Sequence, residues 1–246
     1  MPSTPGSRPE SLPGRPTPSA GRPSAGRSAS SAAEDYLKAV WSLGQGGAVV
    51  STTALAERLG VIPSSVSGMV RKLAELGLVT HDPYRSVGLT DAGRRLAVDV
   101  VRRHRLLELF LAQELELPWD EVHAEAEVLE HALSPRLVER ISAKLGHPTR
   151  DPHGDPIPAA DGSVADDDTV PLSGLDRGAC GVLVRVSDSD PAMLRYLSDH
   201  RIALGDRVEV LERGPFDGPL TVRVGPTELA VGGGLATAIR VALDPG

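Results

Sequence analysis

Apolar residues recur every three or four positions through the first two thirds of the chain, a spacing that predicts amphipathic helices. A first helix is predicted over residues 32–43. Its apolar positions form one core-facing stripe, made of Tyr36, Leu37, Val40 and Trp41. The acidic residues Glu34 and Asp35 fall in the first turn, where they favour the helix dipole.

The next segment predicts two helices joined by a tight turn, the pattern of a helix-turn-helix. Ser51 or Thr52 caps the first of these helices, and Pro63 opens the second. Two short apolar runs, 78–80 and 87–90, flank a turn that contains proline and predict a β-hairpin. A helix-turn-helix followed by such a hairpin predicts a winged-helix domain.

In a winged helix the start of the second helix enters the major groove of DNA. Small residues there let the helix approach base edges closely. The residues expected to lie near bases are Ser64, Ser65, Ser67 and Gly68, and those expected to meet phosphates are Arg71, Lys72 and Arg85. Winged helices also serve as protein-contact modules, and serines at a helix start can simply be caps, so that alternative stays open.

A long helix is predicted over residues 91–115, and a break at Pro118 separates it from a second helix capped by Asp120. Candidate metal ligands gather on this pair: His104, Glu108, His123, Glu127, Glu130 and His131. His104 and Glu108 are four residues apart, so each helix can present a nitrogen and a carboxylate to a common point. Such ligands suit manganese, iron(II), cobalt or zinc, and the carboxylates favour the harder ions. The alternative for any single pair is a solvated helix face.

Beyond these helices the pattern changes twice. A third helix starts at Ser134 and Pro135 with Leu137, Ile141 and Leu145 on one stripe, and these helices offer a dimer surface. Residues 147–168 are rich in Pro, Gly and Asp, which predicts an exposed linker. From residue 170 onward, short strand-like runs separated by Gly or Pro predict a small β-barrel with one helix around residues 193–200. Gly232, Gly233 and Gly234 are predicted to form a turn.

Composition narrows the class of protein. Residues 1–30 consist almost wholly of Pro, Ser, Gly, Ala, Thr and Arg, which predicts a disordered, basic arm. The net charge of −7 means that any DNA contact must be local. The single cysteine, Cys180, excludes an internal disulfide and is expected to be a small buried residue. No apolar run approaches the roughly 20 residues that span a bilayer, and the N-terminus lacks a signal-peptide core, so we expect a cytoplasmic protein with no membrane partner.

The chain from residue 32 to 246 closely resembles the diphtheria toxin repressor and manganese transport regulator family. The likeness rests on the winged-helix pattern, then HRLLELFL, EVHAEAEVLEHALS and PHGDPIP, and finally the barrel. It implies a mainly α N-terminal region, comprising a winged helix-turn-helix and a helical dimerisation domain, followed by a small all-β SH3-like barrel. The domains expected are the arm (1–30), the winged helix (31–95), the helical metal-binding and dimerisation domain (96–147), the linker (148–169) and the SH3-like, FeoA-like barrel (170–246).

The resemblance also implies roles for individual residues. The primary, DNA-activating metal site would be Asp35, Glu127, Glu130 and His131, and the ancillary site His104, Glu108 and His123. Iron-type members carry methionine and cysteine at the positions of Asp35 and Glu127, whereas manganese-type members carry an aspartate and a glutamate. The resemblance therefore favours manganese(II) as the cofactor, with iron(II), cobalt(II) or zinc(II) as alternatives.

Two departures from the family pattern concern single positions. Lys38 stands where manganese-type members place a further glutamate ligand, and a salt bridge could be its role instead. Met193 replaces a glutamine ligand of the iron-type barrel, which leaves Asp190 as the ancillary ligand expected from the barrel. The alternative for Asp190 is a surface loop acid.

The function implied is a homodimeric repressor that binds palindromic double-stranded DNA operators when loaded with metal and shuts off metal-uptake genes. Metal would tie Asp35, on the helix before the DNA-binding unit, to ligands on the dimerisation side. Two rivals come from other classes of protein. A metallohydrolase could use the same ligands, but the sequence has no HExxH motif and no nucleophile elbow. A metal-independent scaffold could use the barrel to contact a partner protein.

Overall fold

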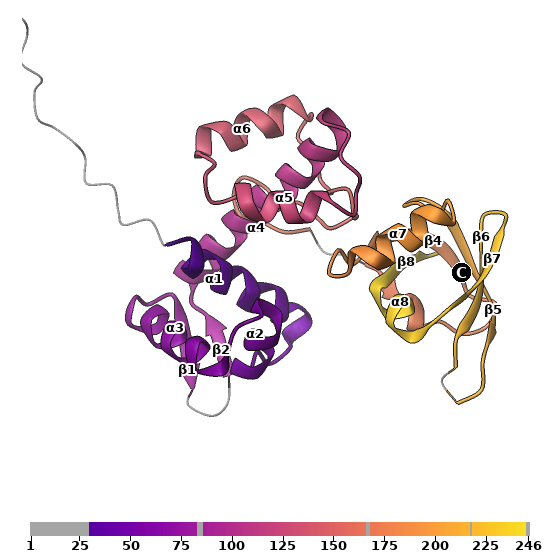
Figure 1. The fold of residues 1–246 in the computed structure, drawn as a ribbon, viewed down its shortest axis with the longest axis horizontal. Coiled ribbons are helices and arrows are strands. Elements are labelled where there is room, and N and C mark those ends of the chain that lie inside the picture. Colours follow the sequence, from indigo (N-terminus) through magenta and orange to yellow (C-terminus); the bar gives the residue numbers. More distant parts are fainter. Residues whose placement is uncertain (1–29, 83–85, 166–167, 217, 245–246) are drawn as a thin grey trace, which may run out of the picture.

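The computed structural model describes residues 30–82, 86–165, 168–216 and 218–244. The expected N-terminal arm lies outside the described residues, apart from Ser30. The described chain buries three apolar clusters, one in each part seen in Figure 1. Within these ranges no helix combines the length and the apolar character needed to cross a bilayer.

The first part is a winged helix-turn-helix, as predicted. Its elements are α1 (Ser31–Leu43), a 3-10 turn η1 (Gln45–Gly47), α2 (Thr52–Leu59), α3 (Pro63–Glu75), β1 (Val79–Asp82) and β2 (Ser86–Leu89). The Ser51 hydroxyl accepts a hydrogen bond from the Ala54 amide at the start of α2, and Pro63 takes the first position of α3. The two strands pair antiparallel as the wing. The predicted apolar stripe of α1 is buried.

The second part consists of α4 (Asp91–Glu114), α5 (Val122–Leu129) and α6 (Pro135–Lys144). The Thr90 hydroxyl caps α4 by accepting from the Gly93 amide. A Cβ atom on Gly93 would lie 1.9 Å from the Leu78 carbonyl oxygen, so only glycine lets α4 lie this close to the wing. One prediction about these helices is wrong: the N-cap of α5 is Glu121, whereas Asp120 pairs with Arg195 of the third part. On α6, Val138 and Ile141 are buried and Leu137 is exposed.

The third part is a six-stranded antiparallel sheet in the order β3-β8-β4-β5-β6-β7. Its elements are β3 (Val170–Pro171), η2 (Leu172–Gly174), β4 (Cys180–Val186), α7 (Pro191–Asp199), β5 (Arg207–Arg213), β6 (Leu220–Val224), β7 (Thr227–Val231), α8 (Gly233–Ala238) and β8 (Ile239–Leu243). Alternate residues of β6 and β7 face the core, as period-two patterning requires. The glycine turn predicted at 232–234 instead begins the short helix α8, and Cys180 is partly exposed rather than buried.

The prediction of an exposed linker is wrong for much of residues 151–158, where most residues are buried. Arg105 of α4 holds this stretch by donating to the Pro156 carbonyl (2.6 Å) and to Asp155 (2.9 Å). Gly154 has a φ of +88°, and a Cβ atom there would lie 2.0 Å from the Val184 carbonyl oxygen. Proline and glycine in this segment therefore shape a packed connection rather than a loose one.

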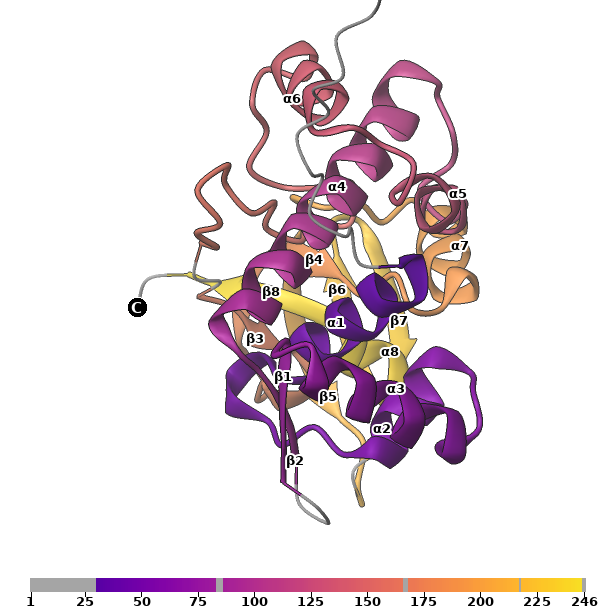
Figure 2. The same cartoon turned by 90° about the vertical axis from the view of Figure 1, so that its left-hand side faces the viewer.

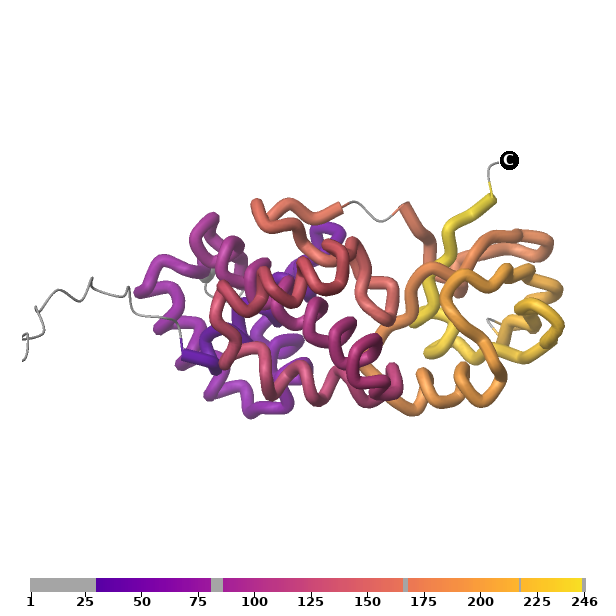
Figure 3. The backbone as a smooth tube through the Cα atoms, turned by 90° about the horizontal axis from the view of Figure 1, so that it is seen from above, coloured from indigo at the N-terminus to yellow at the C-terminus, as the bar shows by residue number. Residues whose placement is uncertain are grey.

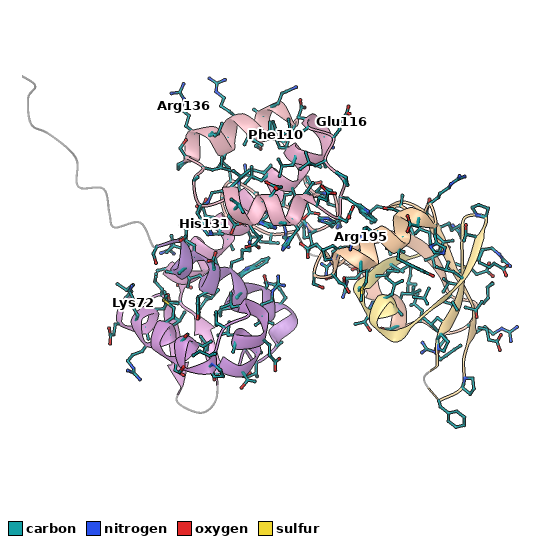
Figure 4. All side chains as sticks on the ribbon, in the orientation of Figure 1. Lys72, Phe110, Glu116, His131, Arg136 and Arg195 are labelled. Carbon is teal, nitrogen blue, oxygen red and sulfur yellow. The ribbon has the colours of Figure 1, made fainter. Side chains whose placement is uncertain are left out.

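In Figure 1, α5 and α6 lie above the winged helix, and α4 runs from the winged helix up to them. The β domain lies to the right of both parts in Figures 1 and 3 and behind them in Figure 2. The β domain is docked through α7. Trp119, just before α5, donates from its ring nitrogen to the Ser198 hydroxyl (2.7 Å), and Arg195 reaches Asp120 at 3.1 Å. Figure 4 shows Arg195 at this junction.

Candidate metal centre and DNA-contact surface

Four side chains from α4, α5 and the β domain converge in what we call the Asp188 cluster: His104, Glu108, His123 and Asp188. The His123 Nδ1 atom lies 3.1 Å from Glu108 Oε1, 2.8 Å from Asp188 and 3.1 Å from His104 Nε2. His104 Nε2 is also 2.9 Å from Glu108. Because His104 and Glu108 are one helical turn apart on α4, they present their ligand atoms side by side.

The electrostatics of this cluster are those of closely paired opposite charges. Burial alone would lower the pKa of His123, but hydrogen bonds to Asp188 and Glu108 raise it to about 10. Burial alone would raise the pKa of Asp188, whereas His123 lowers it to about 2. Burial would likewise raise the pKa of Glu108, but the imidazole groups around it hold it well below its ordinary value. The carboxylates therefore stay ionised beside these imidazole groups.

The Asp188 cluster fits a divalent metal ion. Two imidazole nitrogens face each other at 3.1 Å, an approach that one shared proton or a cation between them makes favourable. Glu108 is fully buried, yet its Oε2 atom has no hydrogen-bond partner among the described residues. A buried carboxylate oxygen without a partner is costly unless a cation or a donor satisfies it. Nitrogen and oxygen ligands without thiolate suit manganese, iron, cobalt or zinc.

A second group, the Asp35 cluster, joins α1 to the end of α5 and consists of Asp35, Glu130 and His131. Its central contact is the 2.8 Å approach of His131 Nε2 to Asp35, and the Glu130 carboxylate lies 3.5 Å from the same nitrogen. Figure 4 shows His131 between the winged helix and the helices above it. Burial raises the pKa of Asp35 above its ordinary value, although His131 opposes the shift. The cluster therefore joins the first helix of the DNA-binding unit to the helical domain.

The two clusters adjoin each other along His104, Glu127 and Glu130, which we call the shared wall. His104 turns its Nε2 atom to the Asp188 cluster and its Nδ1 atom to Glu130, at 2.6 Å. Glu127, predicted to be a primary ligand, belongs to this wall rather than to the Asp35 cluster: its carboxylate lies 2.7 Å from the Lys38 ammonium. The salt bridge considered for Lys38 is therefore present.

Asp190, the ligand expected from the β domain, lies outside both clusters. Its carboxylate accepts from the Ala192 amide and caps α7, while Asp188, two residues earlier, reaches His123. The backbone that places Asp190 at the N-cap of α7 directs Asp188 toward α5.

Sequence reasoning also missed two residues behind the ligands. Glu34 Oε2 lies 2.6 Å from His131 Nδ1, and its other oxygen meets Arg103 at 3.3 Å. A carboxylate on Nδ1 fixes the ring so that Nε2 faces the ligand position. His153 is fully buried behind Glu108, 3.9 Å from its Oε1 atom, and donates from Nε2 to the Trp119 carbonyl at 2.6 Å. In the sequence, Glu34 could have been noticed because it is adjacent to Asp35, and His153 because it lies in the PHG motif of residues 152–154.

Both clusters can be reached from solvent. A cleft of ≈ 310 Å³ is lined by residues that include Asp35, Lys38 and Glu127. A larger cavity of ≈ 610 Å³ lies where the three parts meet, and its walls include His123 and Asp188.

The candidate DNA-contact surface is the outer face of α3. The residues predicted to lie near bases, together with Arg71 and Lys72, are exposed: Ser64, Ser65, Ser67, Gly68, Arg71 and Lys72. Figure 4 shows Lys72 on the outer side of the winged helix. Arg85 lies outside the described residues.

Comparisons with known proteins match each part of the chain. Residues 29–87 match the N-terminal DNA-binding domain of iron-dependent repressors, and residues 90–159 match the metal-binding and dimerisation domain of the same repressors. Residues 170–243 match the FeoA domain.

Whole-chain relatives and structures agree with these matches. The iron-dependent repressor IdeR of Mycobacterium leprae is 33% identical over 85% of this chain and 95% of its own. A solved structure of a manganese-dependent transcriptional repressor in complex with manganese is 50% identical, with a TM-score of 0.82 over 86% of this chain and 99% of that one. The manganese regulator SloR is 35% identical, with a TM-score of 0.74 over 86% of this chain and 98% of its own.

Proposed function

The chain belongs to the family of iron-dependent and manganese-dependent repressors that includes the diphtheria toxin repressor, and from that premise we propose that it is a manganese(II)-activated, homodimeric repressor of metal-uptake genes. Members of this family are transcriptional repressors and not enzymes, so we do not retain the metallohydrolase alternative. Because its proposed target is a DNA operator, we place its action in the cytoplasm.

The observation that carries the proposal is the Asp35 cluster. Asp35 belongs to the first helix of the winged-helix unit, whereas Glu130 and His131 belong to the helical domain. Asp35, Glu130 and His131 would hold a divalent ion, which would supply a cross-link between the two units. Glu34 holds His131 in the orientation in which Nε2 faces Asp35, and Arg103 ties Glu34 to the Glu130 carbonyl. We infer that the cross-link favours the spacing of α3 that the operator requires.

Manganese is the metal that we propose on the basis of the oxygen donors. Asp35 and Glu130 supply carboxylates beside a single imidazole in the Asp35 cluster. Carboxylate-rich sites suit hard ions better than soft ones. The similarity to a manganese-dependent repressor, at 50% identity, supports the same metal. The similarity to IdeR supports the alternative, an iron(II)-responsive repressor.

A homodimer and a palindromic operator follow from the same premise. Exposed apolar side chains lie on α5 and α6, at Val128, Leu129 and Leu137, and support a surface that a second copy covers. Two copies of α3 would read two half-sites about 34 Å apart, one turn of DNA. The exposed serines at the start of α3 leave its backbone free to approach base edges.

The test is an electrophoretic mobility-shift titration against the DNA upstream of the protein's own gene, at fixed salt because phosphate contacts depend on salt. Manganese(II), iron(II) under anaerobic conditions, zinc(II) and a chelator are compared. We expect manganese to induce the shift at the lowest concentration. Asp35→Ala should abolish the metal-induced shift, while the matched control Glu125→Gln, an exposed carboxylate on α5, should keep it. Binding that metal and chelator leave unchanged would reject the proposal.

A further inference from the structure

The ammonium of Lys38 lies at the wall shared by the two clusters. It donates to Glu127 Oε1 at 2.7 Å and to both oxygens of Glu130 at 2.9 Å. It is also 3.2 Å from His104 Nδ1. The group formed by His104, Glu127 and Glu130 has the spacing of a metal site, and Lys38 reaches all three. The side chain is only 11% exposed, so its charge faces these residues with little screening by water.

This arrangement differs from an ordinary salt bridge. A surface lysine usually meets one carboxylate and contributes little. Lys38 instead engages both oxygens of Glu130, including Oε1, the oxygen that lies 3.5 Å from His131. A metal ion at the Asp35 cluster would use that same carboxylate. The ammonium and the metal therefore draw on the same negative charge.

Lys38 also contacts Glu127, the second carboxylate that a metal ion at the Asp35 cluster could use. The Glu127 side chain is 39% exposed and borders the ≈ 310 Å³ cleft that Asp35 also borders. Room thus exists for the carboxylate to turn toward Asp35. Its shortest contact is the 2.7 Å one with Lys38, and His123 Nε2 lies farther from the same oxygen, at 3.6 Å.

We propose that the Lys38 ammonium is an internal competitor for Glu127 and Glu130, and that it sets the concentration of divalent metal at which the Asp35 cluster fills. The inference rests on the proposed function and adds an affinity-determining residue to it. Lys38 acts against metal binding in two ways. Its positive charge repels a nearby divalent ion, and its contact with Glu127 keeps that carboxylate away from the ion.

The experiment measures manganese(II) binding by equilibrium dialysis in full-length protein that carries Asp188→Asn, which weakens the other cluster. Adding Lys38→Met, which keeps an unbranched side chain shorter by the terminal nitrogen and removes the charge, should tighten binding at least about tenfold. Lys144→Met removes the charge of a 62% exposed lysine and should change nothing. Lys38→Gln serves if the methionine variant fails to fold, as judged by circular dichroism.

The outcomes distinguish a failure of the proposed function from a failure of the role proposed for Lys38. If neither the parent nor the Lys38 variants bind manganese, the proposed function fails and this inference fails with it. If the parent binds manganese and the Lys38 variants bind it equally or more weakly, the proposed function stands and the role of Lys38 is overturned.

A double-mutant cycle tests the part played by Glu127. In a Glu127→Gln background, Lys38→Met should bring a smaller gain than in the parent, because the carboxylate that it would release is already gone. Equal gains in the two backgrounds would overturn the competition for Glu127.

Discussion

The Asp35 cluster and the Asp188 cluster use the same kinds of side chain but connect different parts of the molecule. The first cluster joins α1 to the end of α5; the second joins α4 and α5 to the β domain. Each combines a buried carboxylate with a more exposed one: Glu130 is 0% and Asp35 38% exposed in the first, and Glu108 is 1% and Asp188 24% exposed in the second. One cluster therefore links the DNA-binding unit to the helical domain, and the other links the helical domain to the β domain.

The largest expected contrast is in the stability of the metal-free protein. Glu108→Ala should lower the free energy of unfolding by about 3 kcal/mol, because it leaves His104 and His123 buried without their shared acceptor. Asp35→Ala should cost less than about 1 kcal/mol, since Asp35 is partly solvated. Urea unfolding in the presence of a chelator measures both. Equal losses would remove the distinction between the clusters.

The next contrast concerns the ligand from the β domain. Asp188→Asn should weaken metal binding at its own cluster by about a hundredfold and leave the Asp35 cluster unchanged. The matched control is Asp190→Asn, which alters the cap of α7 without touching His123. Calorimetric titration with manganese(II) resolves the two binding steps. A larger effect from Asp190→Asn would restore Asp190 as the ligand.

A smaller effect is expected behind the Asp35 cluster. Glu34→Gln should weaken metal binding there by about tenfold, because the amide no longer holds His131 as a carboxylate does. Asp99→Asn removes another partner of Arg103, at 3.2 Å, and should leave metal affinity unchanged. The same titration reads out both variants, and a loss confined to Asp99→Asn would contradict the positioning role of Glu34.

The smallest effect is expected from a docking contact of the β domain that holds no metal, the hydrogen bond between Trp119 and Ser198. Trp119→Phe removes the hydrogen bond to Ser198 and should weaken docking of the β domain by about 1 kcal/mol. Ser198→Ala should match it, and the double variant should be no worse than either single one. The rate of protease cleavage between the helical parts and the β domain, with and without manganese, reports the docking. If neither substitution changes the cleavage rate, the remaining contacts, such as those of Asp188 with His123 and of Arg195 with Asp120, hold the domain.

Much of the fold could be predicted from the sequence, because its signals are local. Ser51, Thr90 and Ser134 cap helices as their side chains suggest, and Pro63 begins α3. Short strand-like runs separated by Gly or Pro predicted the strands of the β domain, among them β5, β6 and β7. The six candidate ligands on the two helices follow from helical spacing, and five of them fall within the two clusters.

What could not be predicted depends on long-range packing. Asp188 and Asp190 lie two residues apart in a polar loop, and the start of α7 decides which one reaches His123. The burial of His153 and its neighbours could not be predicted from the sequence, because Pro and Gly are as typical of loose linkers as of tight connections. The position of Glu127 depends on Lys38, a residue of α1 that is 89 positions away in sequence.

The placement of Asp188 has a consequence for how the molecule is made. A ribosome completes the winged helix and the helical domain before it starts the β domain, and domains generally fold as they emerge. All three residues of the Asp35 cluster are therefore present once His131 has been added to the chain, whereas the Asp188 cluster must wait for the last domain. The order of synthesis therefore supplies the residues of the Asp35 cluster first, and the β domain later brings Asp188 to His104, Glu108 and His123.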